Sequence, residues 1–147
     1  MTELNVNQTD LFRVFVYGTL KPGEAYYKRY CAGRVVSAQR AFVFGRLFDL
    51  SVGYPGMTLG EDKVKGYLLS FADGSVLTLL DDLEDYSPNR PMSENIYNRQ
   101  YIEVYKLDGE SLGQAWVYVM SWERVQQLGG KLEVDGWWSD RSLQWVD

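Results

Sequence analysis

The sequence contains no histidine and only one cysteine, Cys31. These absences exclude a disulfide framework, a zinc site built from cysteine and histidine, and a catalytic triad that depends on imidazole. Chemistry would therefore depend on carboxylates, hydroxyls and backbone amides. Because no histidine is present to activate its thiol, and buried cysteines are most often structural, Cys31 is interpreted as a packing residue.

Positive charge is also scarce. Fifteen Lys and Arg residues against twenty Asp and Glu residues give a net charge of -5, and the basic residues form no cluster. A nucleic-acid partner is not expected, because phosphates require a basic stripe, and an anionic membrane surface is disfavoured for the same reason. The N-terminus lacks the basic and apolar segments of a secretion signal, and no apolar run approaches membrane-spanning length. We therefore expect a cytoplasmic protein.

The chain of 147 residues, 46% of them hydrophobic, has the size of one ordinary domain with its own core. Residues 1–10 are polar and predict a flexible N-terminal arm, and residues 11–147 predict a single domain. The tail carries Trp137, Trp138 and Trp145, which favour an apolar cover for the core. The alternative is that these tryptophans form an exposed surface for a partner.

Aromatic and β-branched residues predict a first strand over residues 12–17, which ends at Gly18. A short helix is expected over residues 24–30. Further strands are predicted at 41–50, 64–71, 102–107 and 114–120, with a turn at Asp108-Gly109 between the last two. Helices are predicted over 75–85 and 121–128. Strands outnumber helices, so the expected class is α+β, with a small mixed, largely antiparallel β-barrel flanked by helices.

The predicted helix over residues 75–85 carries a stripe of apolar residues and a run of acids. The stripe consists of Val76, Leu79, Leu80 and Leu83. On this geometry Asp81, Asp82 and Asp85 should face water, the usual position of such acids. Glu84 lies at the border of the stripe, beside Leu77 and Leu80, where partial desolvation would raise its carboxyl pKa toward that of a general base.

The segment Tyr17-Gly18-Thr19-Leu20 follows the first strand directly. A glycine at this place lets the backbone turn tightly and point several N–H groups into one concavity, which would attract a carboxylate or oxyanion. An ordinary strand-to-helix turn is the alternative. The segment Gly53-Tyr54-Pro55-Gly56 is interpreted as a turn without a catalytic role.

Together these segments resemble the gamma-glutamyl cyclotransferase-like family, in which a strand ends in Tyr-Gly-Ser/Thr and a later helix carries Leu-Asp-x-x-Glu. The corresponding residues here are 17–20 and 80–84. Supporting matches in the same order are Gly45-Arg46-Leu47-Phe48, Tyr54-Pro55-Gly56, Val64-Lys65-Gly66, Tyr97-Asn98-Arg99 and Ala115-Trp116-Val117-Tyr118. The sequence departs from the family pattern at Asp85, at Tyr67 and in the polar loop at 87–96.

The resemblance implies an enzyme that cyclises a γ-glutamyl amine or γ-glutamyl amino acid to 5-oxoproline, with no metal and no cofactor. It implies Glu84 as the general acid/base. Substrate binding would involve Tyr17, Gly18, Thr19 and Leu20, with Tyr118 at the pocket wall and Arg99 steadying a carboxylate.

Two other functions stay open at this stage. A non-catalytic member of the same fold could bind a small acidic or γ-glutamyl metabolite, since a shared fold does not guarantee a shared activity. A related enzyme could instead remove a γ-glutamyl group during natural-product assembly. The partner is a small molecule in each case, and the sequence does not indicate the oligomeric state.

Overall fold

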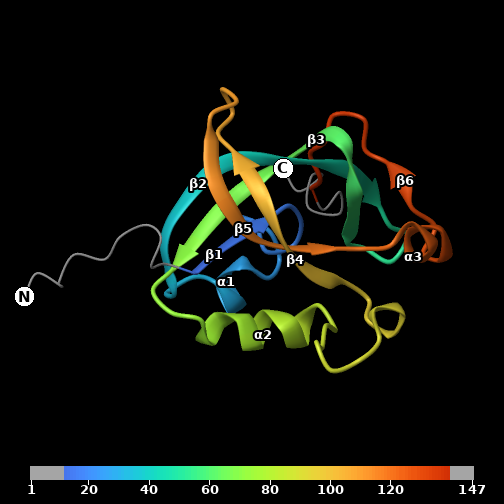
Figure 1. The fold of residues 1–147 in the computed structure, drawn as a ribbon, viewed down its shortest axis with the longest axis horizontal. Coiled ribbons are helices and arrows are strands. Elements are labelled where there is room, and N and C mark those ends of the chain that lie inside the picture. The colour runs from blue at the N-terminus through green and yellow to red at the C-terminus, as the bar shows by residue number, and fades with distance from the viewer. Residues whose placement is uncertain (1–11, 140–147) are drawn as a thin grey trace, which may run out of the picture.

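Among residues 12–139, which the computed structural model describes, six strands form one mixed sheet that curls into a ring (Figure 1). The strands are β1 (Phe12–Val16), β2 (Val35–Asp49), β3 (Pro55–Phe71), β4 (Asn98–Tyr105), β5 (Ser111–Val119) and β6 (Lys131–Leu132). Their order is β3-β1-β5-β4-β2-β6, and β3 also pairs with β2, which closes the ring. Only the β1–β5 pairing is parallel among these described strands. The predicted α+β class with a small, largely antiparallel barrel is confirmed.

The strands β2 and β3 form a long hairpin, and both are longer than the sequence predicted. The register shifts between Gly45, opposite Asp62, and Arg46, opposite Thr58. A Cβ at Gly60 would lie 2.8 Å from the Arg46 side chain, so glycine permits the close approach at this irregularity. The glycines that predicted a connecting loop therefore lie partly inside β3, and only residues 50–54 form the turn.

Three helices lie outside the ring in the described part of the chain: α1 (Tyr27–Tyr30), α2 (Ser75–Leu83) and α3 (Trp122–Gln127). A 3-10 turn, η3 (Met92–Glu94), lies in the loop before β4. Figure 1 shows α2 running along one side of the ring, next to α1. Ser121 caps α3 by accepting a hydrogen bond from the Arg124 amide, so the helix predicted there is confirmed.

The core has two adjoining apolar clusters. One lies between the sheet and the helices α1 and α2 and includes the fully buried Cys31. Burial raises the pKa of the Cys31 thiol to about 11, which is consistent with its interpretation as a packing residue. The other fills the ring and includes Trp138, which is only 2% exposed. The Trp138 indole donates a hydrogen bond to Asp49 at 2.7 Å. The expectation of an apolar cover is therefore confirmed for Trp138, whereas Trp145 lies outside the described residues.

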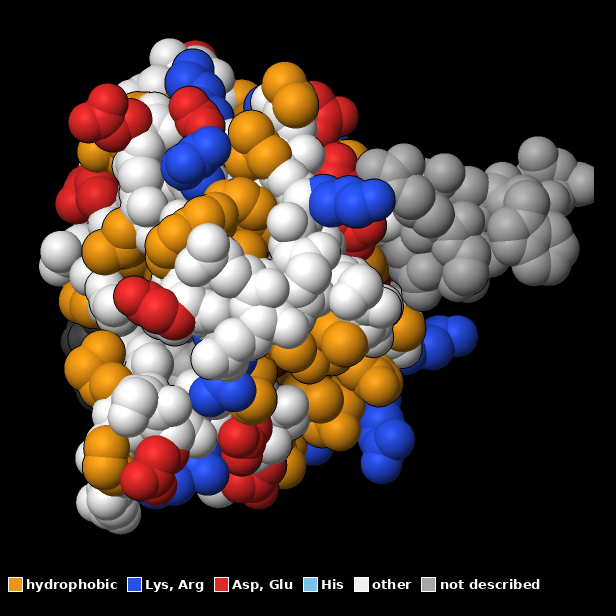
Figure 2. Space-filling view, turned by 90° about the vertical axis from the view of Figure 1, so that its right-hand side faces the viewer, with side chains coloured by type: hydrophobic (Ala, Val, Ile, Leu, Met, Phe, Trp, Pro, Cys, Tyr) orange, Lys and Arg blue, Asp and Glu red, His pale blue; other side chains and the backbone are white. Residues whose placement is uncertain are grey.

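The surface gives no sign of a concentrated charge on the face shown in Figure 2, where Lys and Arg side chains lie scattered among acidic and apolar ones. The arm predicted for residues 1–10 also lies outside the described residues. Within residues 12–139, no helix is long and apolar enough to cross a membrane.

Candidate active site

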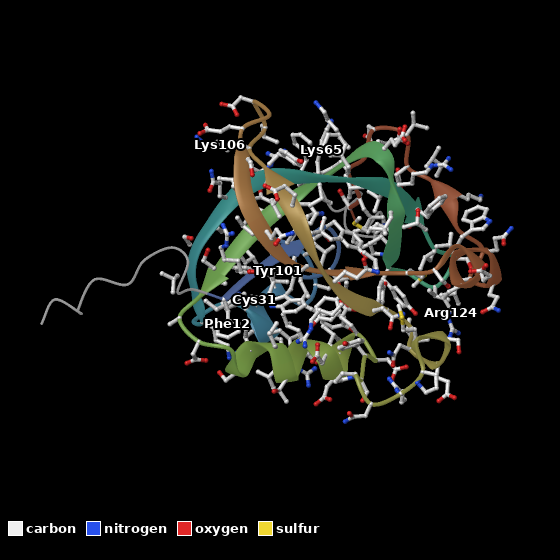
Figure 3. All side chains as sticks on the ribbon, viewed as in Figure 1. Phe12, Cys31, Lys65, Tyr101, Lys106 and Arg124 are labelled. Atoms are coloured by element: carbon white, nitrogen blue, oxygen red, sulfur yellow. The ribbon has the colours of Figure 1, made fainter. Side chains whose placement is uncertain are left out.

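A cavity of about 430 Å³ lies where the end of β1, the β2–β3 turn and the end of α2 meet. Figure 3 shows side chains projecting into the space between the ring and α2. Its lining includes all four residues of the segment 17–20, together with Glu84 and Tyr118. Segments at least 34 residues apart in the sequence therefore contribute to one hollow. The other lining residues are Phe15, Val16, Ala25, Tyr26, Val52, Gly53, Tyr54, Pro55, Leu83 and Tyr97.

The loop at residues 17–20 turns away from the sheet directly after β1. Its carbonyl groups are used inside the protein: Gly18 accepts a hydrogen bond from the Lys21 amide at 3.0 Å and Thr19 accepts one from the Tyr26 amide at 2.9 Å. Within residues 12–139, the amides of Gly18, Thr19 and Leu20 donate to no protein acceptor. Such a group of unpaired N–H donors beside a cavity is suited to an anionic ligand group.

Lys21, which follows this loop, is buried and joins it to the C-terminal tail. Its ammonium donates to the Trp138 carbonyl, forms a 3.5 Å ion pair with Glu24 and lies 4.2 Å from the centre of the Trp137 ring. Burial lowers the pKa of Lys21. The tail thus stabilises the loop from the side away from the cavity, a role that the sequence motif did not indicate.

Gly18 is required for space, because a Cβ at this position would lie 2.6 Å from Cγ of Pro55. We expect Gly18→Ala to lower the free energy of unfolding by about 1–3 kcal/mol, the usual cost of overpacking a rigid site. Urea denaturation would measure the loss. The double variant Gly18→Ala/Pro55→Ala lacks the Pro55 ring atoms and should recover part of it. A Gly18→Ala protein as stable as the wild type would show that the loop relaxes freely.

Glu84 is the residue that follows α2, and its amide still donates to the Leu80 carbonyl at 2.9 Å. The side chain is partly buried and lines the cavity. Burial raises the pKa of the Glu84 carboxyl to about 8. Within the described residues no hydrogen bond or ion pair reaches this carboxyl, so desolvation alone accounts for the shift.

The buried face of α2 differs from the predicted stripe. Val76, Leu77 and Leu80 are buried, whereas Leu79 is exposed. The helix is therefore rotated so that Leu77 points inward in place of Leu79. Since residues seven positions apart lie on nearly the same side of a helix, Glu84 lies in line with Leu77, closer to the middle of the buried face than the sequence indicated.

The same rotation corrects the prediction that Asp81 faces water. Asp81 lies one turn beyond Leu77 and is only 17% exposed. Its carboxylate accepts a hydrogen bond from the Tyr118 hydroxyl at 2.6 Å and from Arg99 Nη1 at 3.1 and 3.2 Å. Asp82 and Asp85 are exposed, as predicted.

The structure places Arg99 behind the cavity wall, because Arg99 is absent from the residues that line the cavity. It forms an ion pair with Asp81, so the carboxylate that Arg99 binds belongs to the protein. The sequence suggested that Arg99 steadies a substrate carboxylate; in the structure its described ionic partner is Asp81, and that role stays a prediction.

Three buried tyrosines surround Glu84. Burial is the main cause that raises the pKa of each of them, and the charge of Glu84 adds to it. Tyr17 donates its hydroxyl hydrogen bond to the Tyr118 carbonyl at 2.6 Å and accepts one from the Met57 amide at 3.3 Å. Tyr97 donates to the Pro55 carbonyl. Tyr118 lines the cavity and is 4% exposed.

Two parts of the wall were missed in the sequence. Gly53, Tyr54 and Pro55, interpreted there as turn residues only, line the cavity. Tyr97 does so as well. The signals available in the sequence were the two matching segments Tyr54-Pro55-Gly56 and 97–99. The cavity depends on how the β2–β3 turn folds back over the end of β1, which local sequence patterns do not show.

Comparisons with known proteins identify relatives of this chain. The sequence model of the family described as "Gamma-glutamyl cyclotransferase, AIG2-like" matches residues 14–140. The gamma-L-glutamyl-butirosin B gamma-glutamyl cyclotransferase of Niallia circulans is 33% identical over 106 residues, which cover 71% of this chain and 65% of that protein. A putative gamma-glutamylcyclotransferase of Halalkalibacterium halodurans is 38% identical over 63 residues, 42% of this chain and 54% of the relative. The matches thus span between half and two thirds of these two relatives.

Solved structures show the same fold. A crystal structure of a mouse AIG2-like protein superposes with a TM-score of 0.58 at 26% identity, covering 76% of this chain and 78% of the other. The solution structure of the Escherichia coli protein YtfP gives a TM-score of 0.53 at 29% identity, covering 89% of this chain and 99% of the other. The resemblance seen in the sequence is confirmed, and the chain belongs to the gamma-glutamyl cyclotransferase, AIG2-like family.

Proposed function

We propose that the protein is a gamma-glutamyl cyclotransferase that converts a γ-glutamyl compound to 5-oxoproline, with Glu84 as its general acid/base. This proposal depends on one observation. A carboxyl group whose pKa is raised to about 8 lies in the same cavity as the unpaired amides of residues 18–20. The names of the curated relatives support a γ-glutamyl substrate.

The substrate would bind with its α-carboxylate at the amides of the loop and its α-ammonium near Glu84. The nucleophile and the γ-carbonyl belong to one molecule, so the protein has to hold a folded conformation and move protons. Glu84 accepts a proton from the ammonium, the amine nitrogen bonds to the γ-carbonyl carbon, and the C–N bond to the leaving nitrogen breaks as Glu84 returns a proton to it. The ammonium loses two protons in becoming the lactam N–H. The departing nitrogen takes one on expulsion and the free amine takes the second.

The raised pKa of Glu84 suits this proton transfer. An α-amino group ordinarily titrates near 8 and an ordinary glutamate near 4.3, so transfer to an unperturbed carboxylate would be uphill by about four pKa units. Burial removes most of this mismatch, because it raises the pKa of Glu84 to about 8. The reaction in this form uses only groups of this chain, and we propose that it takes place in the cytoplasm.

We further propose that the leaving group is an amine without a carboxylate. Glu84 is the only charged side chain among the described residues that line the cavity, and the remaining wall is largely aromatic and aliphatic. The loop amides can bind one carboxylate. A γ-glutamyl amino acid would bring a second carboxylate with no cation to receive it, which costs binding energy.

A matched pair of substrates tests both proposals. L-γ-glutamyl-ethylamine and L-γ-glutamyl-L-alanine differ by one carboxylate on the leaving group. We expect 5-oxoproline from both, with kcat/KM at least about tenfold higher for the ethylamine compound. Equal values, or a preference for alanine, would contradict the amine preference. A chain that binds these compounds without releasing 5-oxoproline would be a non-catalytic member of the family.

A further inference from the structure

Asp81 contacts the cavity wall from behind. It does not line the cavity, but its carboxylate accepts the hydroxyl hydrogen bond of Tyr118, which does. Asp81 lies one turn before Glu84 on α2. It therefore joins the end of α2, next to the proposed acid/base, to the strand β5 that carries Tyr118.

Arg99 holds Asp81 in this position. Arg99 on β4 lies directly opposite Tyr118 on β5 in the antiparallel register, so the two side chains share one face of the sheet. Its guanidinium donates to Asp81 and lies 4.6 Å from the centre of the Trp116 ring and 5.2 Å from that of Tyr86. Contacts with two rings and a carboxylate restrict the guanidinium to one orientation.

Three of the tyrosine hydroxyl protons around Glu84 are directed to other acceptors. A tyrosine hydroxyl has a single proton to donate. That of Tyr118 goes to Asp81, that of Tyr17 to the Tyr118 carbonyl and that of Tyr97 to the Pro55 carbonyl. Two further tyrosines line the cavity, Tyr26 and Tyr54, and neither hydrogen-bonds to Glu84; no Lys or Arg occurs among the described lining residues.

We propose that Asp81 is a positioning residue for the acid/base: by taking the hydroxyl proton of Tyr118, it keeps that donor away from Glu84 and leaves only the oxygen of Tyr118 to face the cavity, as an acceptor. A carboxylate that receives a hydrogen bond is stabilised in its charged form and becomes a weaker base. Asp81 therefore preserves the basicity of Glu84. The acceptor oxygen of Tyr118 is also suited to a substrate ammonium. The consequence for turnover rests on the proposed function, whereas the effect on Glu84 itself does not.

Removal of the Asp81 carboxylate tests this proposal. In Asp81→Ala the Tyr118 hydroxyl can turn to Glu84, and we expect the pKa of Glu84 to fall by about one unit, the effect of one hydrogen bond to a carboxylate. The probe is the ¹³C carboxyl titration of Glu84 by NMR, with the signal identified from its absence in Glu84→Gln. The matched control is Asp82→Ala, which removes the neighbouring, exposed carboxylate of the same helix and should leave the pKa of Glu84 unchanged.

The same substitution in a Tyr118→Phe protein separates the effect of the Tyr118 hydroxyl on the pKa of Glu84 from the direct effect of the lost Asp81 charge. In Tyr118→Phe the donor is absent, so adding Asp81→Ala should change the pKa of Glu84 by less than about 0.3 unit. An equal fall in both backgrounds would overturn the proposal, because it would show that lost negative charge acts directly on Glu84. Asp81→Asn keeps an acceptor oxygen and should lower the pKa less than Asp81→Ala does. Asp81→Asn keeps the test valid if the Asp81→Ala protein does not fold. An unchanged pKa of Glu84 in a folded Asp81→Ala protein would also overturn the proposal.

The same variants distinguish this proposal from the proposed function. The wild-type protein could release no 5-oxoproline while the pKa of Glu84 depends on Asp81 only when Tyr118 is present. That result would support the positioning role and refute the cyclotransferase activity. Normal turnover with a pKa of Glu84 that is independent of Asp81 would support the cyclotransferase activity and refute the positioning role. If both hold, kcat/KM of Asp81→Ala should reach its plateau about one pH unit lower than that of the wild type.

Discussion

Glu84→Gln is expected to lower kcat for 5-oxoproline release by at least about a hundredfold, and by up to ten thousandfold, without disturbing the fold. The range is that of general acid–base catalysis by one positioned side chain. Glutamine has nearly the same shape and can occupy the same place at the end of α2, but it can neither accept the ammonium proton nor return one to the leaving nitrogen. Quantifying 5-oxoproline by mass spectrometry under single-turnover conditions would separate this chemical step from product release.

Asp82→Asn is the matched control for this variant. Asp82 is an exposed acid on the same helix, and its change should leave kcat within about twofold of the wild-type value, as is usual for surface positions. Binding of L-γ-glutamyl-ethylamine should survive in Glu84→Gln, because the loop amides are unchanged. Wild-type turnover in a folded Glu84→Gln protein would remove Glu84 from the mechanism, whatever its position in the cavity.

Local patterns in the sequence were sufficient for most of the elements. The strand that ends at Gly18, the hairpin around Asp108-Gly109 and the capped helix α3 each depend on residues close together in the chain. The lengths of β2 and β3 were not predicted, since the pairing partner of a glycine-rich segment is decided by distant residues. In this hairpin Gly60 marks a bulge inside a strand, where it lies against Arg46.

The helix α2 shows why the site was only partly predictable. Leu77 and Leu79 are equally apolar and lie on different sides of the helix, so the apolar pattern allows two rotations. Packing against the sheet selects the rotation that buries Leu77, and it also turns Asp81 toward Arg99 and Tyr118. These two partners are 18 and 37 residues away along the chain, and the pairing of β4 with β5 brings them together. Position 84 stood out in the sequence, whereas the contacts of Asp81 required the tertiary structure.

The burial that makes Glu84 a base should also reduce the stability of the protein at alkaline pH. Folding raises the pKa of this carboxyl from about 4.5 to about 8, so the folded state binds the proton more tightly than the unfolded state does. Stability is therefore unaffected by this group below about pH 4.5, decreases as the pH rises from 4.5 to 8, and stays at the lower level above that range. With about 1.4 kcal/mol for each pKa unit, the loss is on the order of 5 kcal/mol.

Urea unfolding of the wild type and of Glu84→Gln between pH 5 and pH 9 would measure this effect. Other titrating groups, including Lys21, are common to both proteins and largely cancel in the difference between the two free energies of unfolding. We expect this difference to change steadily from pH 5 upward, because pH 5 already lies above the unfolded pKa, and to shift in favour of Glu84→Gln by a few kcal/mol at pH 9. Asp82→Asn should show no such divergence from the wild type. Parallel pH dependences of wild type and Glu84→Gln would mean that the folded protein leaves the Glu84 carboxylate well solvated, and the proposed base would lose the burial on which its strength depends.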